Sequence, residues 1–377
     1  MSAKPARILS IAGSDSSGGA GIQADIKTIT MLGGYAMTAV TAITAQNTLG
    51  VHSAEILSAD MVAAQIDACI NDMGVDAVKI GMLGAPQIAN IVADRLEQLA
   101  VPIIFDPVMV ATSGSVLADS DTIAAFERLL SIAALTTPNL AELDALGGDS
   151  AMAQRRVAYL AKGGDSGKDT LTDRLIRPGR DELRWSAERI ETRHTHGTGC
   201  TLSSAIATFM ASGLALGQAI ERAREFVRLA LYDAPGFGAQ SGPLGHQAVR
   251  MDLIGEPRLN QITLAATNYQ EAVLFYRAIG LTQIVDSPAN GYARFESEGG
   301  VTVSISTGHG GTGAASIYLE CLDVDAYTAM LREHGIACPA PADQSWGWRE
   351  SWITDPGGNR VCFYQAGEIR RYPPWRI

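Results

Sequence analysis

The sequence predicts an α/β protein in which a parallel sheet lies between two layers of helices, followed by a smaller α+β domain. Two observations predict the first part. Short, continuously apolar runs alternate with segments of helical periodicity, and a glycine-spaced turn at residues 197–199 leads directly into an apolar helix. A third observation predicts the second part: a pattern of strand, helix and short strands begins near residue 259 and recurs from residue 317.

Length and composition fit a soluble protein with two domains. The chain has 377 residues, of which 47% are apolar and 18% are charged, and its formal net charge is -11. Negative charge disfavours binding to nucleic acid or to an anionic membrane surface, so we expect small-molecule partners. The five cysteines form no Cys-X-X-Cys pair, and no run reaches the roughly 20 apolar residues that span a bilayer. These features predict a cytoplasmic protein without a disulfide framework.

The first element is an apolar strand that ends in a glycine-rich loop and leads into a helix. The strand covers residues 8–12 and the loop residues 13–21, after which apolar residues recur at helical spacing from Ile22 to Leu32. The loop contains neither a Walker sequence nor Gly-X-Gly-X-X-Gly, so an ordinary nucleotide fingerprint is absent. Phosphate is therefore expected to bind elsewhere in the chain.

Strands and helices continue to alternate along the first part of the chain. Apolar strands are expected at residues 37–45, 77–82, 103–106 and 134–139, with a helix at about 59–73. Ligands of parallel sheets collect at the carboxyl ends of the strands. The residues that fall at or just after these ends are Asp15, Asp25, Gln46, Asn47, Lys79, Met82, Asp106, Asn139 and Glu142.

The turn at residues 195–204 is the strongest candidate for an anion site. Gly197 and Gly199 allow close approach of the backbone, and the first amides of the following helix have no partners within the helix. Free amides and the helix dipole favour a phosphoryl group. Cys200 in the first turn is expected to have a lowered pKa, which makes it a candidate base. Taken alone, the stretch also fits a tight turn with a buried cysteine.

Six short motifs occur in a fixed order along this part of the chain. They are residues 12–25 (AGSDSSGGAGIQAD), 45–48 (AQNT), 79–83 (KIGML), 106–109 (DPVM), 137–142 (TPNLAE) and 195–200 (THGTGC). Together they resemble the hydroxymethylpyrimidine/phosphomethylpyrimidine kinases of thiamine synthesis over residues 5 to about 250. The resemblance implies a ribokinase-like fold, the use of ATP and Mg²⁺, and phosphorylation of a pyrimidine alcohol and then of its monophosphate.

The resemblance implies a pocket for the pyrimidine ring. Gln46 would hydrogen-bond the aminopyrimidine, because the edge of this ring needs a paired donor and acceptor and an amide offers both. The walls of the pocket would be formed by Gly13, Asp25, Met82 and Val108.

The resemblance also implies roles in phosphoryl transfer. The amides of Gly197, Thr198 and Gly199 would form an oxyanion hole, and Cys200 would take the proton of the alcohol. Stabilisation of the spread charge supplies most of the rate in phosphoryl transfer, so positioning matters more than base strength. Magnesium and the ATP phosphates would be held by Asp106, Asn139 and Glu142.

Residues 146–175 depart from the family pattern, which has a helix, a buried strand and a lysine that contacts an ATP phosphate. Two interpretations are open. In one, residues 157–161 are the strand, Lys162 is the nucleotide lysine and the helix before it is lost. In the other, residues 151–160 are a helix and the strand is lost with its lysine. Arg155 and Arg156 suit a helix better than a buried strand, so we favour the missing strand, which would weaken kinase activity.

A second domain is expected after a linker at residues 255–257, which gives predicted domains of 1–254 and 258–377. Each half of the second domain reads as strand, helix and three strands. Paired βαβββ units with Phe275-Tyr276 and the turn at 355–359 resemble the vicinal oxygen chelate superfamily, which includes glyoxalase I and bleomycin-resistance proteins. This resemblance covers residues 258 to about 367.

The second domain lacks the metal ligands of that superfamily. The four facing strand positions hold Gln261, Ser304, Ser316 and Cys362, so no metal is expected. His309 and His334 fall at surface positions. The tryptophans of this domain are expected either to line an aromatic ligand pocket or to pack; they are Trp346, Trp348 and Trp352. We therefore expect a metal-free binding or regulatory module.

Three functions remain open at this point. The leading hypothesis is a pyrimidine kinase in thiamine biosynthesis. The alternatives are a pyridoxal/pyridoxine kinase, which has the same fold, and a pyrimidine-binding sensor without catalysis. Both resemblances imply a homodimer.

Overall fold

The computed structural model describes residues 4–109, 117–164, 169–248, 261–297, 301–307, 316–321, 324–345 and 347–365. The chain divides into two compact units, Met1–Gly255 and Glu256–Ile377. In the described part of the chain, no helix combines the length and the apolar character needed to cross a membrane.

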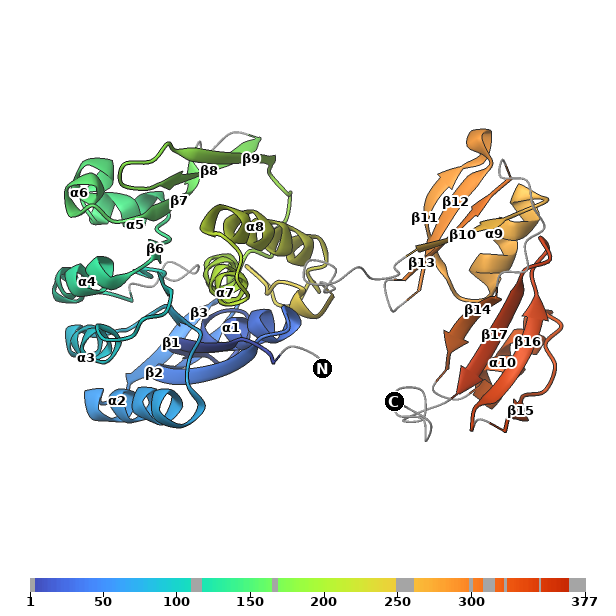
Figure 1. Cartoon of the computed structure of the whole chain (residues 1–377), viewed down its shortest axis with the longest axis horizontal. Helices are drawn as coiled ribbons and strands as arrows, with labels where there is room; N and C mark the ends of the chain where they lie inside the picture. Colours follow the sequence, from blue (N-terminus) through green and yellow to red (C-terminus); the bar gives the residue numbers. More distant parts are fainter. Residues whose placement is uncertain are drawn as a thin grey trace. The chain divides into compact units, whose positions relative to one another are not determined.

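The first unit is built on one nine-stranded sheet (Figure 1). Its strands are β1 (Arg7–Asp15), β2 (Tyr35–Asn47), β3 (Gly50–Ile56), β4 (Ala77–Ile80), β5 (Ile103–Phe105), β6 (Leu135–Thr136), β7 (Tyr159–Gly164), β8 (Thr170–Ile176) and β9 (Leu183–Glu188). Their order is β3-β2-β1-β4-β5-β6-β7-β8-β9. The strands from β2 to β7 in this order are parallel. At one edge β3 pairs antiparallel with β2, and at the other β8 pairs antiparallel with both β7 and β9.

Helices cover both faces of this sheet (Figure 1). Strand β1 shows why: Ile8 packs into one apolar core, while Leu9 and Ile11 face the other. One core contains residues of α1, α7 and α8, and the other contains residues of α2, α3, α4, α5 and α6. The helices are α1 (Gly21–Met31), α2 (Ala59–Ala68), α3 (Pro86–Leu96), α4 (Ser120–Ile132), α5 (Leu140–Ala145), α6 (Gly148–Arg155), α7 (Thr198–Ala211) and α8 (Leu216–Tyr232), with short turns η1 (Cys69–Met73) and η2 (His246–Ala248). The predicted α/β/α sandwich is confirmed.

Helix α7 is buried on nearly all sides, which fixes the position of its first turn. Residues from Thr201 to Phe209 are all buried, and the helix contacts α1, α8 and the strands β1, β4 and β5. Burial of large apolar side chains such as Ile206 and Phe209 contributes about 1.5–3 kcal/mol each. The start of α7 is therefore held rigidly against the sheet.

The strand that the sequence led us to regard as missing is present as β7. Helix α6 is also present, so the expectation that one of the two elements had been lost is wrong. The error came from reading residues 151–160 as one element. Arg155 and Arg156 belong to the end of α6, where Arg156 adopts a left-handed conformation (φ 56°), and the buried strand begins only at Tyr159.

The second unit consists of two βαβββ copies, as expected (Figure 1). Each copy forms a four-stranded sheet, in the orders β10-β13-β12-β11 and β14-β17-β16-β15. Tyr276 of the first copy donates to Asp355 of the second (2.8 Å), which links the two copies. The first copy contains β10 (Gln261–Ala265), α9 (Tyr269–Ala278), β11 (Thr282–Ser287), η3 (Pro288–Asn290), β12 (Tyr292–Glu296) and β13 (Thr302–Ser306). The second contains β14 (Ser316–Glu320), α10 (Val324–Glu333), β15 (Ala342–Asp343), β16 (Arg349–Thr354) and β17 (Arg360–Gln365).

Candidate active site

A cavity of about 890 Å³ opens at the carboxyl ends of the parallel strands of the first unit. Its wall combines residues that follow the strands with the first turn of α7, as the rule for parallel sheets predicts. The cavity brings together almost all of the residues singled out from the sequence, namely Gly13, Gln46, Met82, Asp106, Val108, Asn139, Glu142, Lys162, Gly197, Thr198, Gly199 and Cys200.

Asp25, Asn47 and Lys79 are the exceptions, and the expected place of Asp25 in the pocket wall is wrong. The carboxylate of Asp25 is fully buried, with Lys79 Nζ 2.9 and 3.0 Å from its two oxygens and hydroxyl donors from Ser10 (2.6 Å) and Ser204 (2.7 Å). Burial opposes the charge of Lys79, but the carboxylate of Asp25 outweighs this effect, so the pKa of Lys79 is raised. The first turn of α1 directs Asp25 toward the sheet, so this residue forms a buried ion pair and does not line the cavity.

The turn before α7 is built by a close backbone contact. Gly197 has φ 89°, and a Cβ atom there would lie 1.9 Å from the carbonyl oxygen of Gly19, so only glycine fits. The glycine loop after β1 and the start of α7 are therefore in direct backbone contact. No side chain caps the start of α7, and the residues of its first turn line the cavity, so their amides are candidate anion donors. The amide of Thr198 also donates to the carbonyl of Thr195 (3.3 Å).

Lys162 and Asp106 form an ion pair beside this turn. Lys162 Nζ lies 2.8 Å from Asp106 Oδ1, and Thr137 Oγ1 donates to the same oxygen (2.8 Å). Burial opposes the charge of Asp106, but Lys162 and Lys79 outweigh it, so the pKa of Asp106 is lowered. A Cβ atom on Gly199 would lie 3.3 Å from Lys162 Nζ and 3.4 Å from Asp106 Oδ2, so the ion pair and the start of α7 are adjacent.

Asn139 and Glu142 serve as a helix cap and also line the cavity. Asn139 Oδ1 accepts from the amide of Glu142 (2.9 Å), and Glu142 Oε2 accepts from the amide of Asn139 (2.8 Å). Burial raises the pKa of Glu142, and the charge of Asp106 adds to this effect. Asn139 and Glu142 therefore cap α5 and line the cavity at the same time.

Cys200 does not have the acidic thiol that its position at a helix start led us to expect. Burial raises its pKa to about 11, and the charges of Asp25 and Asp106 add to this, while Lys79 acts in the opposite direction. The expectation considered the helix dipole and left out desolvation, which the sequence does not reveal. The thiol is neutral at physiological pH.

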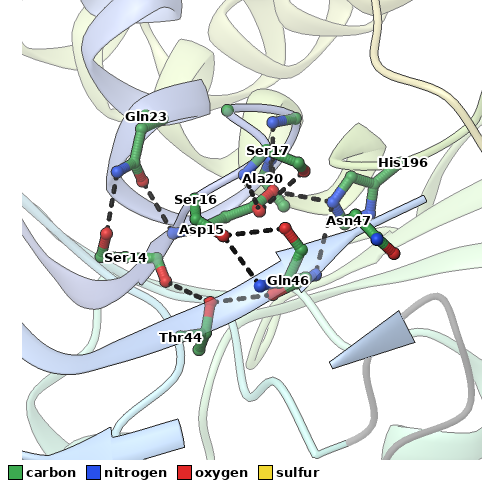
Figure 2. Close-up of polar contacts among 12 residues, drawn as sticks. Ser14, Asp15, Ser16, Ser17, Ala20, Gln23, Thr44, Gln46, Asn47 and His196 are labelled. Carbon is green, nitrogen blue, oxygen red and sulfur yellow. Dashed lines mark hydrogen bonds and ion pairs between the residues drawn. The ribbon is translucent and has the colours of Figure 1, made fainter. Parts of the chain in front are cut away.

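Gln46, which the sequence predicts to bind the ring of the substrate, lines the cavity. It is tied to the glycine loop, because its backbone amide donates to Ser16 Oγ and its carbonyl accepts from the same hydroxyl, both at 2.8 Å. On the opposite wall, a Cβ atom on Gly13 would lie 2.2 Å from Met82 Cε, so glycine at this position leaves room for the Met82 side chain. Figure 2 shows the polar contacts of the Gln46 side chain with Thr44 and His196, and the contact of His196 with Asp15.

Asp15 and His196 are functional candidates whose role sequence reasoning missed. His196 Nε2 lies 2.8 Å from Asp15 Oδ2 and 3.4 Å from Gln46 Nε2 (Figure 2). Asp15 and His196 are both buried. Both lie within the conspicuous motifs, but they are far apart in the chain. The only signal in the sequence was their position beside glycines at strand and helix ends.

The end of the cavity beyond Lys162 is formed by β8, β9 and α8. Asp173 accepts from the amide of Gly163 (2.7 Å) and from Arg224 Nε (2.7 Å), and thus fixes the backbone next to Lys162. Arg189 and Arg228 also line this end. These residues belong to no motif, and nothing in the sequence pointed to them.

The second unit offers no metal site among its described residues. Ser304 is buried and bonded to the Tyr292 hydroxyl (2.9 Å), Ser316 is exposed, and burial raises the pKa of Cys362 to about 12. The side chain of Gln261 lies outside the described residues, as do His309 and Trp346. Over the described residues, no group of three or more His, Cys, Asp or Glu is placed to hold a metal.

Aromatic residues gather on the sheet of the second copy. The Trp348 ring stacks on Tyr364 with a centroid distance of 4.5 Å, and Tyr318 meets both rings edge-on. Arg360 lies over the Trp352 ring, 4.0 Å from its centroid. His334 is exposed at the end of α10.

Comparison with known proteins identifies relatives for each unit. Residues 15–245 match the family described as phosphomethylpyrimidine kinase, and residues 258–363 match the glyoxalase/bleomycin resistance protein/dioxygenase superfamily. The hydroxymethylpyrimidine/phosphomethylpyrimidine kinase of Rhizobium meliloti is 46% identical over 255 residues, which are 63% of this chain and 96% of that protein. The kinase of the same name from Bacillus subtilis is 38% identical over 267 residues (67% and 98%). A probable thiamine biosynthetic bifunctional enzyme of Oryza sativa is 37% identical, and this chain spans 46% of its length.

Solved structures are similar to the same part of the chain. A Bacillus subtilis pyridoxal kinase in complex with ADP has a TM-score of 0.59 and 32% identity, over 65% of this chain and 98% of that one. A phosphomethylpyrimidine kinase from Clostridium difficile has a TM-score of 0.51 and 33% identity, over 59% and 98%.

Proposed function

The chain belongs to the phosphomethylpyrimidine kinase family, and from this premise we propose that its first unit uses ATP to phosphorylate 4-amino-5-hydroxymethyl-2-methylpyrimidine and then the resulting monophosphate, in thiamine biosynthesis. The observation that carries the proposal is that Gln46, the uncapped start of α7 and Lys162 line one cavity. Its volume of about 890 Å³ lies at the upper end of the range for small-molecule sites, which suits two ligands.

The phosphate end is assigned to backbone amides and one lysine. The amides from Gly197 to Gly199 would bind the moving phosphoryl group, and Lys162 would contact an ATP phosphate. Both are fixed before any ligand arrives, since α7 is buried and Lys162 is paired with Asp106. Preorganised donors of this kind account for most of the rate in phosphoryl transfer.

The carboxylates at this end fit a magnesium ion. Asp106 and Glu142 bring two carboxyl groups next to Lys162. Burial raises the pKa of Glu142, Lys162 acts against this, and the charge of Asp106 adds to it. Oxygen ligands next to phosphates are what Mg²⁺ prefers. When bound, the ion would neutralise charge on the phosphate oxygens. Asp106 and Glu142 are the residues that would hold it, with Asn139 keeping Glu142 in place through the helix cap.

Cys200 is assigned a contact with the hydroxymethyl oxygen of the substrate. The expected role as a base is weakened by its pKa of about 11, since a neutral thiol takes up no proton. In a loose phosphoryl-transfer transition state the attacking oxygen keeps its proton until late, so a strong base is not required. We therefore attribute most of the rate enhancement to the backbone amides at the start of α7 and to Lys162.

Purified full-length chain tests the proposal. We expect ADP formation that depends on both the pyrimidine alcohol and Mg²⁺, with the monophosphate and then the diphosphate detected by phosphorus NMR. Folded protein that forms no ADP with either pyrimidine substrate would contradict the assignment.

Pyridoxal is the second candidate substrate, because the first unit is similar in structure to pyridoxal kinases. Assays of both alcohols under the same conditions compare their kcat/KM values. The third possibility, a sensor without catalysis, rested on the loss of a strand and its lysine. The presence of β7 and of Lys162 beside Asp106 removes that reason.

For the second unit we propose a metal-free binding or regulatory module. The serine and cysteine residues at the expected ligand positions support the proposal. We also propose a homodimer in the cytoplasm. None of the five cysteines, which all lie within the described residues, forms a disulfide, and this fits a reducing compartment. Metal analysis of dialysed protein and sedimentation of the full chain test these two points.

A further inference from the structure

The carboxylate of Asp15 is saturated by hydrogen-bond donors. Oδ1 accepts from the amide and the hydroxyl of Ser17 (2.9 and 2.7 Å), and Oδ2 accepts from the amides of Gly19 (3.0 Å) and Ala20 (2.8 Å). Although burial opposes ionisation, hydrogen bonds from His196 and Ser17 lower the pKa of Asp15. An ionised carboxylate only accepts, so His196 Nε2, 2.8 Å from Oδ2, carries a proton that is directed at Asp15.

The amide of Gln46 lies against the same histidine nitrogen. Gln46 Nε2 is 3.4 Å from His196 Nε2, and Gln46 Oε1 is 3.2 Å from Thr44 Oγ1 (Figure 2). The single hydroxyl proton of Thr44 is directed at the carbonyl of Ser14, which is closer at 2.7 Å. In this orientation the amide therefore meets a donor with its N–H and an acceptor with its oxygen. Half a turn of the planar amide exchanges the two atoms. The N–H then donates to the Thr44 oxygen, and the amide oxygen becomes a second, longer acceptor (3.4 Å) for the proton that His196 gives to Asp15.

We propose that His196, held by Asp15, is a positioning residue that sets the direction of the Gln46 amide for recognition of an aminopyrimidine. The inference rests on the proposed function, because it concerns the ring of the same substrate. Its structural basis is that the donor at His196 and the acceptor at Thr44 admit only one direction of the amide.

The direction of the amide determines what the cavity offers to a ring. A primary amide has two N–H donors and two acceptor lone pairs. Thr44 uses one N–H of Gln46, and His196 uses one lone pair. One donor and one acceptor remain, and they match a ring nitrogen next to an amino group. The ligand class that this arrangement selects is a heteroaromatic ring with such an amino-substituted edge.

Ligand binding to the full-length chain without ATP tests this role. The two probes are 4-amino-5-hydroxymethyl-2-methylpyrimidine and 5-hydroxymethyl-2-methylpyrimidine, which lacks the amino group, and calorimetry gives Kd for each. We expect His196→Asn to raise Kd of the amino compound about tenfold, because the Gln46 amide is no longer held in one direction, and to change Kd of the des-amino compound less than about twofold. Equal changes for both probes would overturn the proposal.

His194→Asn is the matched control, because His194 lies two residues earlier and does not line the cavity. A double-mutant cycle with Gln46→Ala gives a second readout. If His196 acts through Gln46, then His196→Asn has no further effect on Kd in the Gln46→Ala background. Additive effects of the two substitutions would contradict this mechanism.

The position of the ring proton in the wild-type chain provides a third test. In protein with ¹⁵N-labelled histidine, the resonances of His196 are those that disappear in His196→Asn. We expect Nε2 of His196 to carry a proton, and a ring protonated only at Nδ1 would overturn the proposal.

The failure of this inference differs from the failure of the proposed function. Wild-type protein that phosphorylates the pyrimidine while His196→Asn binds it normally contradicts the inference alone. If wild-type protein forms no ADP while His196→Asn weakens binding of the amino compound selectively, the kinase alone is contradicted. Protein that binds neither probe contradicts both.

Discussion

Lys162 Nζ lies 2.8 Å from Asp106 Oδ1, although the two residues end strands that are separated in the sheet by β6. The pair places a cation directly beside the first turn of α7. We expect Lys162→Met to lower kcat/KM for ATP about 100-fold, because a fixed charge next to the phosphates is lost. Kd of the pyrimidine should stay within about twofold. Steady-state kinetics check the change, with the exposed Lys4→Met as control. An unchanged kcat/KM would contradict the assignment of Lys162.

A methyl group at residue 199 should disturb the ion pair between Lys162 and Asp106. In Gly199→Ala the added atom would lie 3.3 Å from Lys162 Nζ and 3.4 Å from Asp106 Oδ2, so the ion pair must shift by a few tenths of an ångström. We expect kcat to fall about 10- to 100-fold with little change in thermal stability. In Gly217→Ala, also in a first helical turn, the new methyl meets Leu183 at an ordinary 3.5 Å. This control should keep full activity, and equal losses in both variants would argue against a local effect.

Removal of the thiol should cost little activity. A general base contributes about 10²- to 10⁴-fold, but the pKa of Cys200 is raised to about 11. We expect Cys200→Ser to keep kcat within about tenfold of wild type. Between pH 6.5 and 9 the two proteins should give pH–rate profiles of the same shape. A rate that falls with pH below pH 8 in wild type but not in Cys200→Ser would show instead that the Cys200 thiolate acts as a base.

Glu142 should matter for magnesium more than for folding. Glu142→Gln keeps an oxygen that accepts from the amide of Asn139, so the helix cap is preserved while one negative charge is lost. We expect the Mg²⁺ concentration for half-maximal activity to rise about tenfold with melting temperature nearly unchanged. Magnesium titration after chelator treatment measures the change. The exposed Glu55→Gln serves as control, and identical titration curves for Glu142→Gln and wild type would remove Glu142 from the site.

Stability should fall in mild acid because of a buried histidine. Burial, together with Lys27, lowers the pKa of His246 to about 4, and Thr201 Oγ1 lies 2.8 Å from its Nε2. Between the unfolded pKa and about 4, the unfolded chain binds the proton and the folded chain does not. The free energy of unfolding therefore falls by about 3 kcal/mol as the pH drops through this range.

Urea unfolding of His246→Gln checks this origin. The variant should be less stable than wild type at pH 7.5, and the difference should shrink toward pH 4.5. The exposed His52→Gln should follow wild type at every pH. A difference that stays constant with pH would contradict the assignment to His246.

The sheet, the two helical layers and the phosphate turn were predictable because each leaves a local signal. Continuous apolar runs such as residues 103–105 indicate strands buried on both faces, and the glycines at 197 and 199 indicate a close backbone contact. The raised pKa of Cys200 was not predictable in the same way. Its thiol is adjacent to a helix start in the sequence, but its desolvation depends on packing that only the structure shows.

Contacts between distant residues account for the other differences. Asp25 is separated from Lys79 by 54 residues, and the sequence gives no reason to pair them. The pairing of Lys162 with Asp106 likewise depends on where β7 joins the sheet, and local composition obscured that strand. Asp15 and His196 are 181 residues apart, so their contact had no local signature.

The contact between Gly19 and Gly197 also bears on how the protein is made. During synthesis the segment around Gly19 leaves the ribosome long before Gly197 does, yet the pocket wall exists only when the two meet. The nascent chain therefore has no complete binding site until nearly all of its first unit has emerged. Premature termination before α7 would yield fragments that carry most of the sheet and cannot hold the substrate.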